Sequence, residues 1–284
     1  MIQMIQPPLN YTGSKFKLLN QILPELNYKK EKFVDLFAGG GSVYANVLDK
    51  YEKIIVNDII KDLVNIHKGI LESDEIIELT KLNCKDLKIN KELYDRLRDS
   101  YNETPSADKL WALILSCNSN LIRFNQKGEF NQTWGKRSWN PSTDKKLDTY
   151  RSHIRKFKEK IKFESKSFEM IEIDENMMIY IDPPYGYVKD KSGEIGNKQI
   201  SEAGYNNFYH QKDDLNLYQF CHKINEIGSS FMISGVLEHG GQTTWILDKL
   251  ISDGFNFKEL NCNYEKINKS GNDKNTIEII VKNY

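Results

Sequence analysis

The segment Asp182-Pro183-Pro184-Tyr185 has the residue types needed to hold a flat amino group. It follows the apolar run 177–181, which predicts a buried strand, and α/β sheets place their sites at the carboxyl ends of such strands. Two prolines remove two backbone N–H groups, so the Asp182 carboxylate and the Pro183 carbonyl form a pair of acceptors. Such a pair suits a planar –NH2 group, and Tyr185 adds a ring on which a flat base can stack. A purely structural Pro-Pro turn is the alternative.

An amino group on an aromatic ring is a poor nucleophile, because its lone pair is delocalised into the ring. Two hydrogen bonds accepted from the group localise that pair toward an electrophile, so positioning and electrostatics can carry most of the rate. This chemistry needs no metal. The five His and four Cys show no ligand spacing and no CxxC, so we expect reduced, buried thiols and no metal site.

A second constellation is the glycine-rich stretch from Asp35 to Ser42, which follows a short apolar strand. Glycines at this place let the backbone approach a ligand closely. The stretch is not a P-loop, because no GKS or GKT follows, and its spacing is not GxGxxG. The next strand ends at Asp58, where an acid can bind the ribose hydroxyls of an adenosine. A tight turn and a surface acid are the structural alternatives.

The elements around these residues predict an α/β fold with a parallel sheet. Before residue 61 we expect helices over 15–26 and 42–48 and strands over 32–37 and 53–56. From 161 onward we expect strands over 177–181, 231–234, 255–260 and 276–282, helices over 212–227 and 244–253, and a loop over 190–204.

The middle of the chain has a different character. Helices are expected over 74–83, 91–101, 107–117 and 144–160, and irregular or hairpin structure over 118–141. The sequence therefore predicts a domain in two pieces, 1–60 and 161–284, with a mostly helical domain inserted at 61–160.

Composition narrows the class of protein. The 284 residues are 39% hydrophobic and 28% charged with net charge +0, typical of a globular chain. We see no membrane span and no signal peptide. Between residues 118 and 162, however, twelve Lys and Arg stand against four acids, an excess of about eight positive charges. This basic segment is either a nucleic-acid contact or a solvated helix face.

These blocks, taken in order, resemble the Dam-type (D12 class, alpha-order) DNA adenine-N6 methyltransferases. The blocks are YTGSK at 11–15, DLFAGGGS at 35–42, ND at 57–58, the basic insert, and DPPY at 182–185. Matching stretches also lie at 120–123, 127–130, 135–137 and 234–239. The resemblance implies a Rossmann-like sheet that binds S-adenosylmethionine (SAM), with an inserted DNA-recognition domain.

The resemblance also implies roles for single residues. Lys15 would hold the methionine carboxylate of SAM, Asp58 its ribose, and Phe168 its adenine. Ser167 replaces the acid that often precedes this aromatic residue. The implied cofactor-binding residues are Tyr11, Lys15, Asp35, Phe37, Gly39, Gly41, Asp58, Phe168 and Asp182. Asp182, Pro183, Pro184 and Tyr185 would hold a target adenine flipped out of the duplex.

In the insert, the resemblance makes Arg123 a base-reading residue and Lys136 and Arg137 phosphate contacts. The implied DNA-binding residues are Asn118, Ser119, Asn120, Leu121, Arg123, Thr133, Lys136 and Arg137. Asn118 stands where the family usually has an aromatic wedge, and Thr133 replaces a usual proline. We therefore expect a GATC or related short site.

The resemblance implies double-stranded DNA as partner, a monomer or weak dimer on it, and a cognate restriction endonuclease as a candidate second partner. It implies a cytoplasmic protein of a bacterium or phage. Methylation of RNA adenine or of a protein glutamine, and a catalytically silent DNA-binding regulator, remain alternatives. A nicotinamide dehydrogenase is disfavoured by the glycine spacing.

Overall fold

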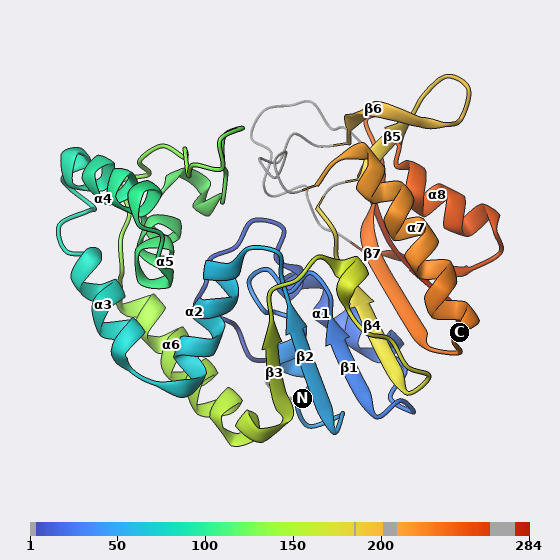
Figure 1. The fold of residues 1–284 in the computed structure, drawn as a ribbon, viewed down its shortest axis with the longest axis horizontal. Coiled ribbons are helices and arrows are strands. Elements are labelled where there is room, and N and C mark those ends of the chain that lie inside the picture. The colour runs from blue at the N-terminus through green and yellow to red at the C-terminus, as the bar shows by residue number, and fades with distance from the viewer. Residues whose placement is uncertain (1–3, 185, 201–208, 262–275) are drawn as a thin grey trace.

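A central sheet organises the molecule (Figure 1). The computed structural model describes residues 4–184, 186–200, 209–261 and 276–284. The strand order is β3-β2-β1-β4-β7-β10-β9, with β8 paired to β7. The bounds are β1 Lys32–Asp35, β2 Lys53–Asn57, β3 Ile161–Glu164, β4 Met177–Ile181, β7 Ser230–His239, β8 Gln242–Thr243, β9 Asn256–Leu260 and β10 Thr276–Lys282.

The first five strands of this order run parallel, and β10 runs antiparallel to both β7 and β9. This mostly parallel sheet confirms the predicted Rossmann-like α/β class. The carboxyl ends of β1, β2, β4 and β7 meet at one edge of the sheet. Asp35 closes β1, Asn57 closes β2 and Asp182 directly follows β4, so the candidate residues converge there.

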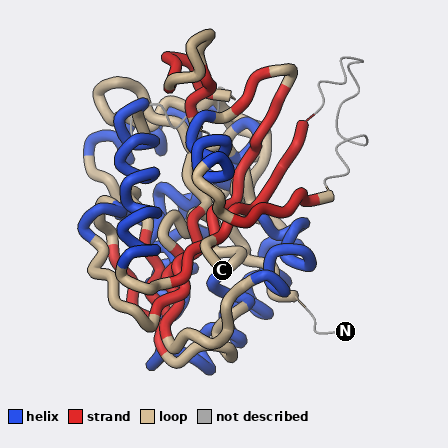
Figure 2. Tube along the Cα trace, turned by 90° about the vertical axis from the view of Figure 1, so that its right-hand side faces the viewer, coloured by secondary structure: helices blue, strands red, loops and turns tan. Residues whose placement is uncertain are grey.

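Alternating apolar side chains let the sheet bury both faces. On β4, Met178 and Tyr180 pack into one buried cluster, and Ile179 and Ile181 into the other. The second cluster is covered by α7 (Gln211–Glu226) and α8 (Trp245–Ser252). The first contains residues of α1 (Leu19–Ile22). Figure 2 shows helices on both sides of the strands.

The inserted segment forms a group of helices beside β3 (Figure 1). It contains α2 Lys61–Glu72, α3 Glu75–Asn83, α4 Lys91–Glu103, α5 Ala107–Ser116 and α6 Pro141–Ile154. Asn140 caps the N-terminus of helix α6, because its side chain accepts from the backbone N–H groups of Ser142 and Thr143. Pro141 occupies the first helical position. Helices α2 and α6 also contact the sheet domain, so the insert is packed against it.

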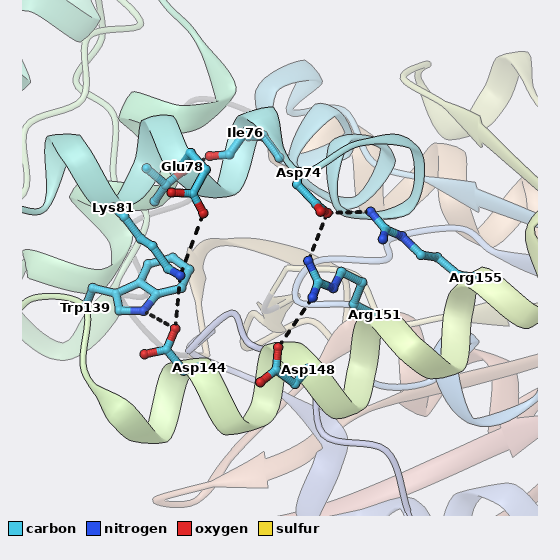
Figure 3. Close-up of polar contacts among 10 residues, drawn as sticks. Asp74, Ile76, Glu78, Lys81, Trp139, Asp144, Asp148, Arg151 and Arg155 are labelled. Atoms are coloured by element: carbon cyan, nitrogen blue, oxygen red, sulfur yellow. Dashed lines mark hydrogen bonds and ion pairs between the residues drawn. The ribbon is translucent and has the colours of Figure 1, made fainter.

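Part of the basic charge of α6 and the turn after it is used inside the insert (Figure 3). Arg151 and Arg155 both bind the carboxylate of Asp74, at 2.9 and 2.8 Å. Lys81 on α3 lies 3.4 Å from the Asp144 carboxylate and over the ring of Trp139. These side chains tie α6 to α3, so the two arginines are not simply a solvated basic face.

One predicted helix is wrong. Residues 42–48 form only the 3₁₀ turn η3 (Tyr44–Asn46). A helix would pair the N–H of Asn46 with the Ser42 carbonyl, but that N–H donates to the carbonyl of Val43 at 3.0 Å and the Asn46 side chain donates to that of Ser42 at 2.8 Å. The side chain of Asn46 is bonded to both backbone groups of Ile5. These bonds hold the chain in a compact turn rather than a helix.

Other elements differ in extent, among them the expected strand 231–234, which is the longer strand β7. Within the expected loop 190–204, Ile195–Gln199 is strand β6, which pairs with β5 (Tyr187–Lys189). The expected helix 15–26 is broken into η1 (Lys15–Leu18), α1 and η2 (Leu23–Glu25). The expected helix 144–160 starts earlier, as α6, and ends in the 3₁₀ segment η5 (Arg155–Lys160). The expected irregular stretch 118–141 includes the 3₁₀ turn η4 (Asn118–Asn120). A further 3₁₀ turn, η6, spans Phe168–Met170.

None of the helices in the described ranges could span a lipid bilayer. The thiols of Cys84, Cys117 and Cys221 are buried and free, while Cys262 lies outside the described residues.

Candidate active site

The glycine-rich turn after β1 is shaped by close backbone approaches. Gly41 has φ +80°, and a Cβ there would lie 2.7 Å from both the His67 ring and the Tyr44 ring. A Cβ on Gly40 would lie 2.7 Å from the Cβ of Tyr11, so Tyr11 packs directly on the turn. Larger residues would push these neighbours away, which explains the run of glycines.

A pocket opens at this turn, and eight of the nine predicted cofactor residues line it. These are Tyr11, Lys15, Asp35, Phe37, Gly39, Asp58, Phe168 and Asp182. The ninth, Gly41, packs against His67 and Tyr44 instead. The fold thus brings together residues that lie up to 171 positions apart in the sequence, from Tyr11 to Asp182.

Two buried carboxylates of the pocket are held by backbone N–H groups. Asp58 accepts from the N–H of Gly39 and of Ile60, both at 3.0 Å, which fixes the glycine turn to the end of β2. Burial raises the pKa of Asp58 in spite of these bonds. Burial also raises the pKa of Asp35 to about 8, and the charges of Asp182 and Asp58 add to this. A positively charged ligand in the pocket would favour the ionised forms of these carboxyl groups.

Aromatic rings form another wall of the pocket. The ring centroid of Phe37 lies 5.7 Å from that of Phe168 and 6.4 Å from that of Tyr209. Tyr209 was not predicted from the sequence, where its signal is only an aromatic residue just before a helix. Its hydroxyl donates to the buried carboxylate of Asp214 at 2.6 Å, which fixes the ring at the pocket.

Asp182 lies where the pocket meets a second cavity. Its Oδ1 lies 2.6 Å from Nζ of Lys15 and accepts a hydrogen bond from Ser234 at 3.2 Å. Burial raises the pKa of Asp182, and the Lys15 charge opposes this shift. Pro183 and Pro184 line both cavities, whereas Tyr185 lies outside the described residues. The predicted role of Lys15 toward a ligand carboxylate remains a prediction.

The predicted DNA-binding stretch forms an irregular hairpin, as expected. Single β-bridges join Cys117 to Trp134 and Phe124 to Phe130. A Cβ on Gly135 would lie 2.3 Å from the carbonyl oxygen of Cys117, so only glycine allows this approach. The exposed residues of the predicted set are Asn118, Ser119, Thr133, Lys136 and Arg137. Leu121 and Arg123 are half-buried, and Asn120 is buried.

The two predicted DNA-contacting arginines have partners within this stretch. Arg123 donates to the side-chain and backbone oxygens of Asn131, at 2.8 and 3.1 Å. Arg137 donates to Oδ1 of the buried Asn120 at 2.9 Å. The bonds to Asn131 use two of the five N–H donors of Arg123, so the guanidinium keeps donors for a base edge. Their roles toward DNA stay predictions.

Within the described residues, no group of three or more His, Cys, Asp or Glu side chains is placed to hold a metal ion. The site is instead a turn of glycines, four carboxyl groups, an aromatic wall and two lysines, all at one edge of a parallel sheet.

Comparison with known proteins agrees with this arrangement. The model of the "D12 class N6 adenine-specific DNA methyltransferase" family matches residues 11–265, nearly the whole chain. The chain belongs to this family.

Relatives of this family member include both restriction-associated and Dam proteins. Modification methylase StsI of Streptococcus sanguinis is 30% identical over 99% of the chain, which spans 43% of the length of that relative. Type II methyltransferase M.MjaIII of Methanocaldococcus jannaschii is 29% identical over 99% of both chains. DNA adenine methylase of Escherichia coli strain K12 is 28% identical, over 62% of this chain and 64% of its own.

Proposed function

We propose that this protein transfers a methyl group from SAM to N6 of an adenine in double-stranded DNA. The observation that carries the proposal is the position of Asp182. Its carboxylate follows β4 and lines both the pocket of the predicted cofactor residues and the adjoining cavity. A group so placed can act on one molecule held in each of them.

The residues of the pocket fit SAM, which carries a positive charge on sulfur and another on its amino group. Asp182 and Asp58 supply carboxylates, Asp35 becomes negatively charged when a cation binds, and Asp58 is the candidate for the ribose hydroxyls. Phe37 and Phe168 offer apolar rings for a purine. Lys15 is the candidate for the ligand carboxylate.

The chemical role of the Asp-Pro-Pro segment follows from its acceptors. Asp182 and the Pro183 carbonyl would each accept a hydrogen bond from the adenine amine, which localises the nitrogen lone pair. When bound, SAM supplies the methyl group: its carbon–sulfur electron pair stays on sulfur as the amine lone pair forms the new bond, and one amine proton is released. Tyr185 is the candidate to stack on the flipped base.

On the DNA side, we propose that 61–160 recognises the duplex and that 1–60 with 161–284 carry the cofactor and the chemistry. Lys136 and Arg137 are exposed and suit phosphate contacts. The resemblance to Dam-type enzymes implies GATC or a related short site, and we propose a cognate restriction endonuclease as a further partner, as the type II relatives suggest. We expect a monomer or weak dimer on DNA, acting in the cytoplasm.

Transfer of labelled methyl groups tests the proposal. Purified protein with methyl-tritiated SAM should label DNA and not RNA or protein, and sequencing of the product should map N6-methyladenine to one short site. Label in RNA or protein would overturn the choice of substrate. The change Asp182→Ala should lower the rate by orders of magnitude and leave the fold intact, because one acceptor of the amine is lost. Near-native turnover of this variant would make the segment a structural turn.

A further inference from the structure

The side chains of Tyr180, Ser234 and Asp182 form a hydrogen-bonded chain that ends at the Asp182 carboxylate. The Tyr180 hydroxyl is 2.7 Å from Oγ of Ser234, and Ser234 lies 3.2 Å from Oδ1 of Asp182. Tyr180 is on β4 and Ser234 on β7, and these strands pair with Ile181 opposite Ile233. Strand pairing therefore fixes Ser234 beside the start of the Asp-Pro-Pro segment.

The direction of each hydrogen bond follows from the chemistry of the groups. An ionised carboxylate only accepts, so Ser234 must donate its single proton to Asp182. Ser234 then accepts from Tyr180, which donates. Tyr180 and Ser234 are 1% and 0% exposed, so water cannot easily replace either group. Burial keeps the pKa of Tyr180 well above its usual value, which keeps the donor proton on its oxygen.

Both donors to the carboxylate converge on one oxygen. Lys15 lies 2.6 Å from Oδ1, the same oxygen that accepts from Ser234. Among the described residues, none donates a hydrogen bond to Oδ2. The carboxylate plane is thus held through Oδ1, and its second oxygen remains available to another donor.

We propose that Ser234 is a positioning residue that anchors Oδ1 of Asp182 so that Oδ2 faces the target amine. The inference rests on the proposed function and adds a residue to it. Ser234 itself does not touch the reacting atoms. Without it, Lys15 alone would hold Oδ1, and the carboxylate could turn about its own bond away from the amine.

Single-turnover methylation at saturating SAM and DNA tests this role. Ser234→Ala should lower the rate by about 10- to 100-fold, the range expected for losing one hydrogen bond to a charged group. The dissociation constant for SAM should stay within about 2-fold, because Asp35, Asp58 and the aromatic wall are unchanged. Ser234→Cys, a weaker donor of similar shape, should give an intermediate rate.

A matched control separates positioning from stability. Ser229 is also a buried serine, immediately before β7, and its hydroxyl bonds to the carbonyls of Asp174 and Met177 at the other edge of the sheet. Ser229→Ala should lower the midpoint of thermal unfolding without lowering the single-turnover rate. If Ser229→Ala and Ser234→Ala lose rate in proportion to lost stability, Ser234 is merely structural.

A double-mutant cycle tests the order of the chain. Tyr180→Phe removes the donor to Ser234 and leaves the bond from Ser234 to Asp182, so its rate loss should be smaller than that of Ser234→Ala. In the Ser234→Ala background, Tyr180→Phe should cost nothing further. Additive losses, or a native rate in Ser234→Ala, would overturn the inference. If Ser234→Ala does not fold, Ser234→Cys decides: a native rate overturns the inference and an intermediate rate supports it. Absence of DNA methylation by the unaltered protein would instead overturn the proposed function.

Discussion

The carboxyl group of Asp35 gives a pH-dependent test of the proposed cofactor pocket. It is 2% exposed, lines the pocket, and accepts a hydrogen bond from the N–H of Tyr44 at 3.1 Å. Burial raises its pKa to about 8, so in the free protein the group is mostly protonated at neutral pH. A cationic ligand favours the ionised form, so binding should release a proton from Asp35.

The expected size follows from the ionised fraction of Asp35. With a pKa of about 8, this fraction is about 1% at pH 6, about 9% at pH 7 and about 50% at pH 8. If SAM binds only the ionised form, its affinity should rise about 50-fold from pH 6 to pH 8 and level off above pH 9. The affinity for SAM rises with pH because the pKa of Asp35 is raised. A pKa of Asp35 below its usual value would leave the affinity constant across this range.

Asp35→Asn is the matched variant, because its amide oxygen can still accept from Tyr44 but cannot ionise. Calorimetric titration of both proteins with SAM across this pH range gives the ratio of their dissociation constants. This ratio cancels the titration of the ligand's own amino group, which lies in the same range. A constant ratio would refute the reasoning. The stability of the wild type relative to Asp35→Asn should also fall as pH rises from about 4 to about 8, since the folded state holds the extra proton there.

Three further predictions use other parts of the site. Asp58→Ala should weaken SAM binding by about 1–3 kcal/mol, measured by calorimetry, and unchanged affinity in a folded variant would remove Asp58 from the site. Arg123→Ala should relax discrimination at one base pair by about 1–3 kcal/mol, whereas Arg137→Ala should weaken binding to all sequences and lower its salt dependence. Identical mismatch profiles in competition binding would contradict this division. Tyr150→Phe should lower the free energy of unfolding in urea by about 1–3 kcal/mol, because the buried Tyr150 hydroxyl, which bonds to Tyr44 and to Nδ1 of His67, is lost. An unchanged midpoint of urea unfolding would contradict this role of the Tyr150 hydroxyl.

The sequence predicted which residues meet at one edge of the sheet better than it predicted the local backbone. Motifs such as Asp35 to Ser42 and Asp182 to Pro184 follow apolar strands, and parallel pairing brings all such strand ends to one edge. Predicting the strands therefore also predicted that the candidate residues after them would lie close together. By contrast, the run at 42–48 has helical spacing, yet the side chain of Asn46 bonds to Ile5 and takes the Ser42 carbonyl. Ile5 lies far outside the run, so no local pattern could reveal this contact.

The residues that sequence reasoning missed act through contacts with distant parts of the chain. Ser234 begins the stretch 234–239 that matches the family, but no role was predicted for it, because its contact with Asp182, 52 positions away, depends on the pairing of β4 with β7. Tyr209 belongs to the pocket because Asp214 holds its hydroxyl there. Serine and tyrosine are common in loops and strands alike, so their residue types alone carry no signal of these positions.

The insert and the glycine-rich turn share one buried polar cluster, which joins regions that the sequence separates. His67 on α2 bonds through Nε2 to the carbonyl of Gly39 at 2.8 Å, so Nε2 must carry the proton and Nδ1 must accept. Burial lowers the pKa of His67 to about 4, which keeps the ring neutral.

The accepting Nδ1 of His67 faces two hydroxyl groups, those of Tyr44 after the glycine turn and Tyr150 on α6. These hydroxyls also bond to each other, so one donates to His67 and the other to its partner. Two helices of the insert thereby hold the turn that lines the proposed cofactor pocket. A displacement of α6, from which Tyr150 extends, would disturb this turn directly. The packing of the pocket therefore depends on residues from both sides of the predicted boundary at 60/61.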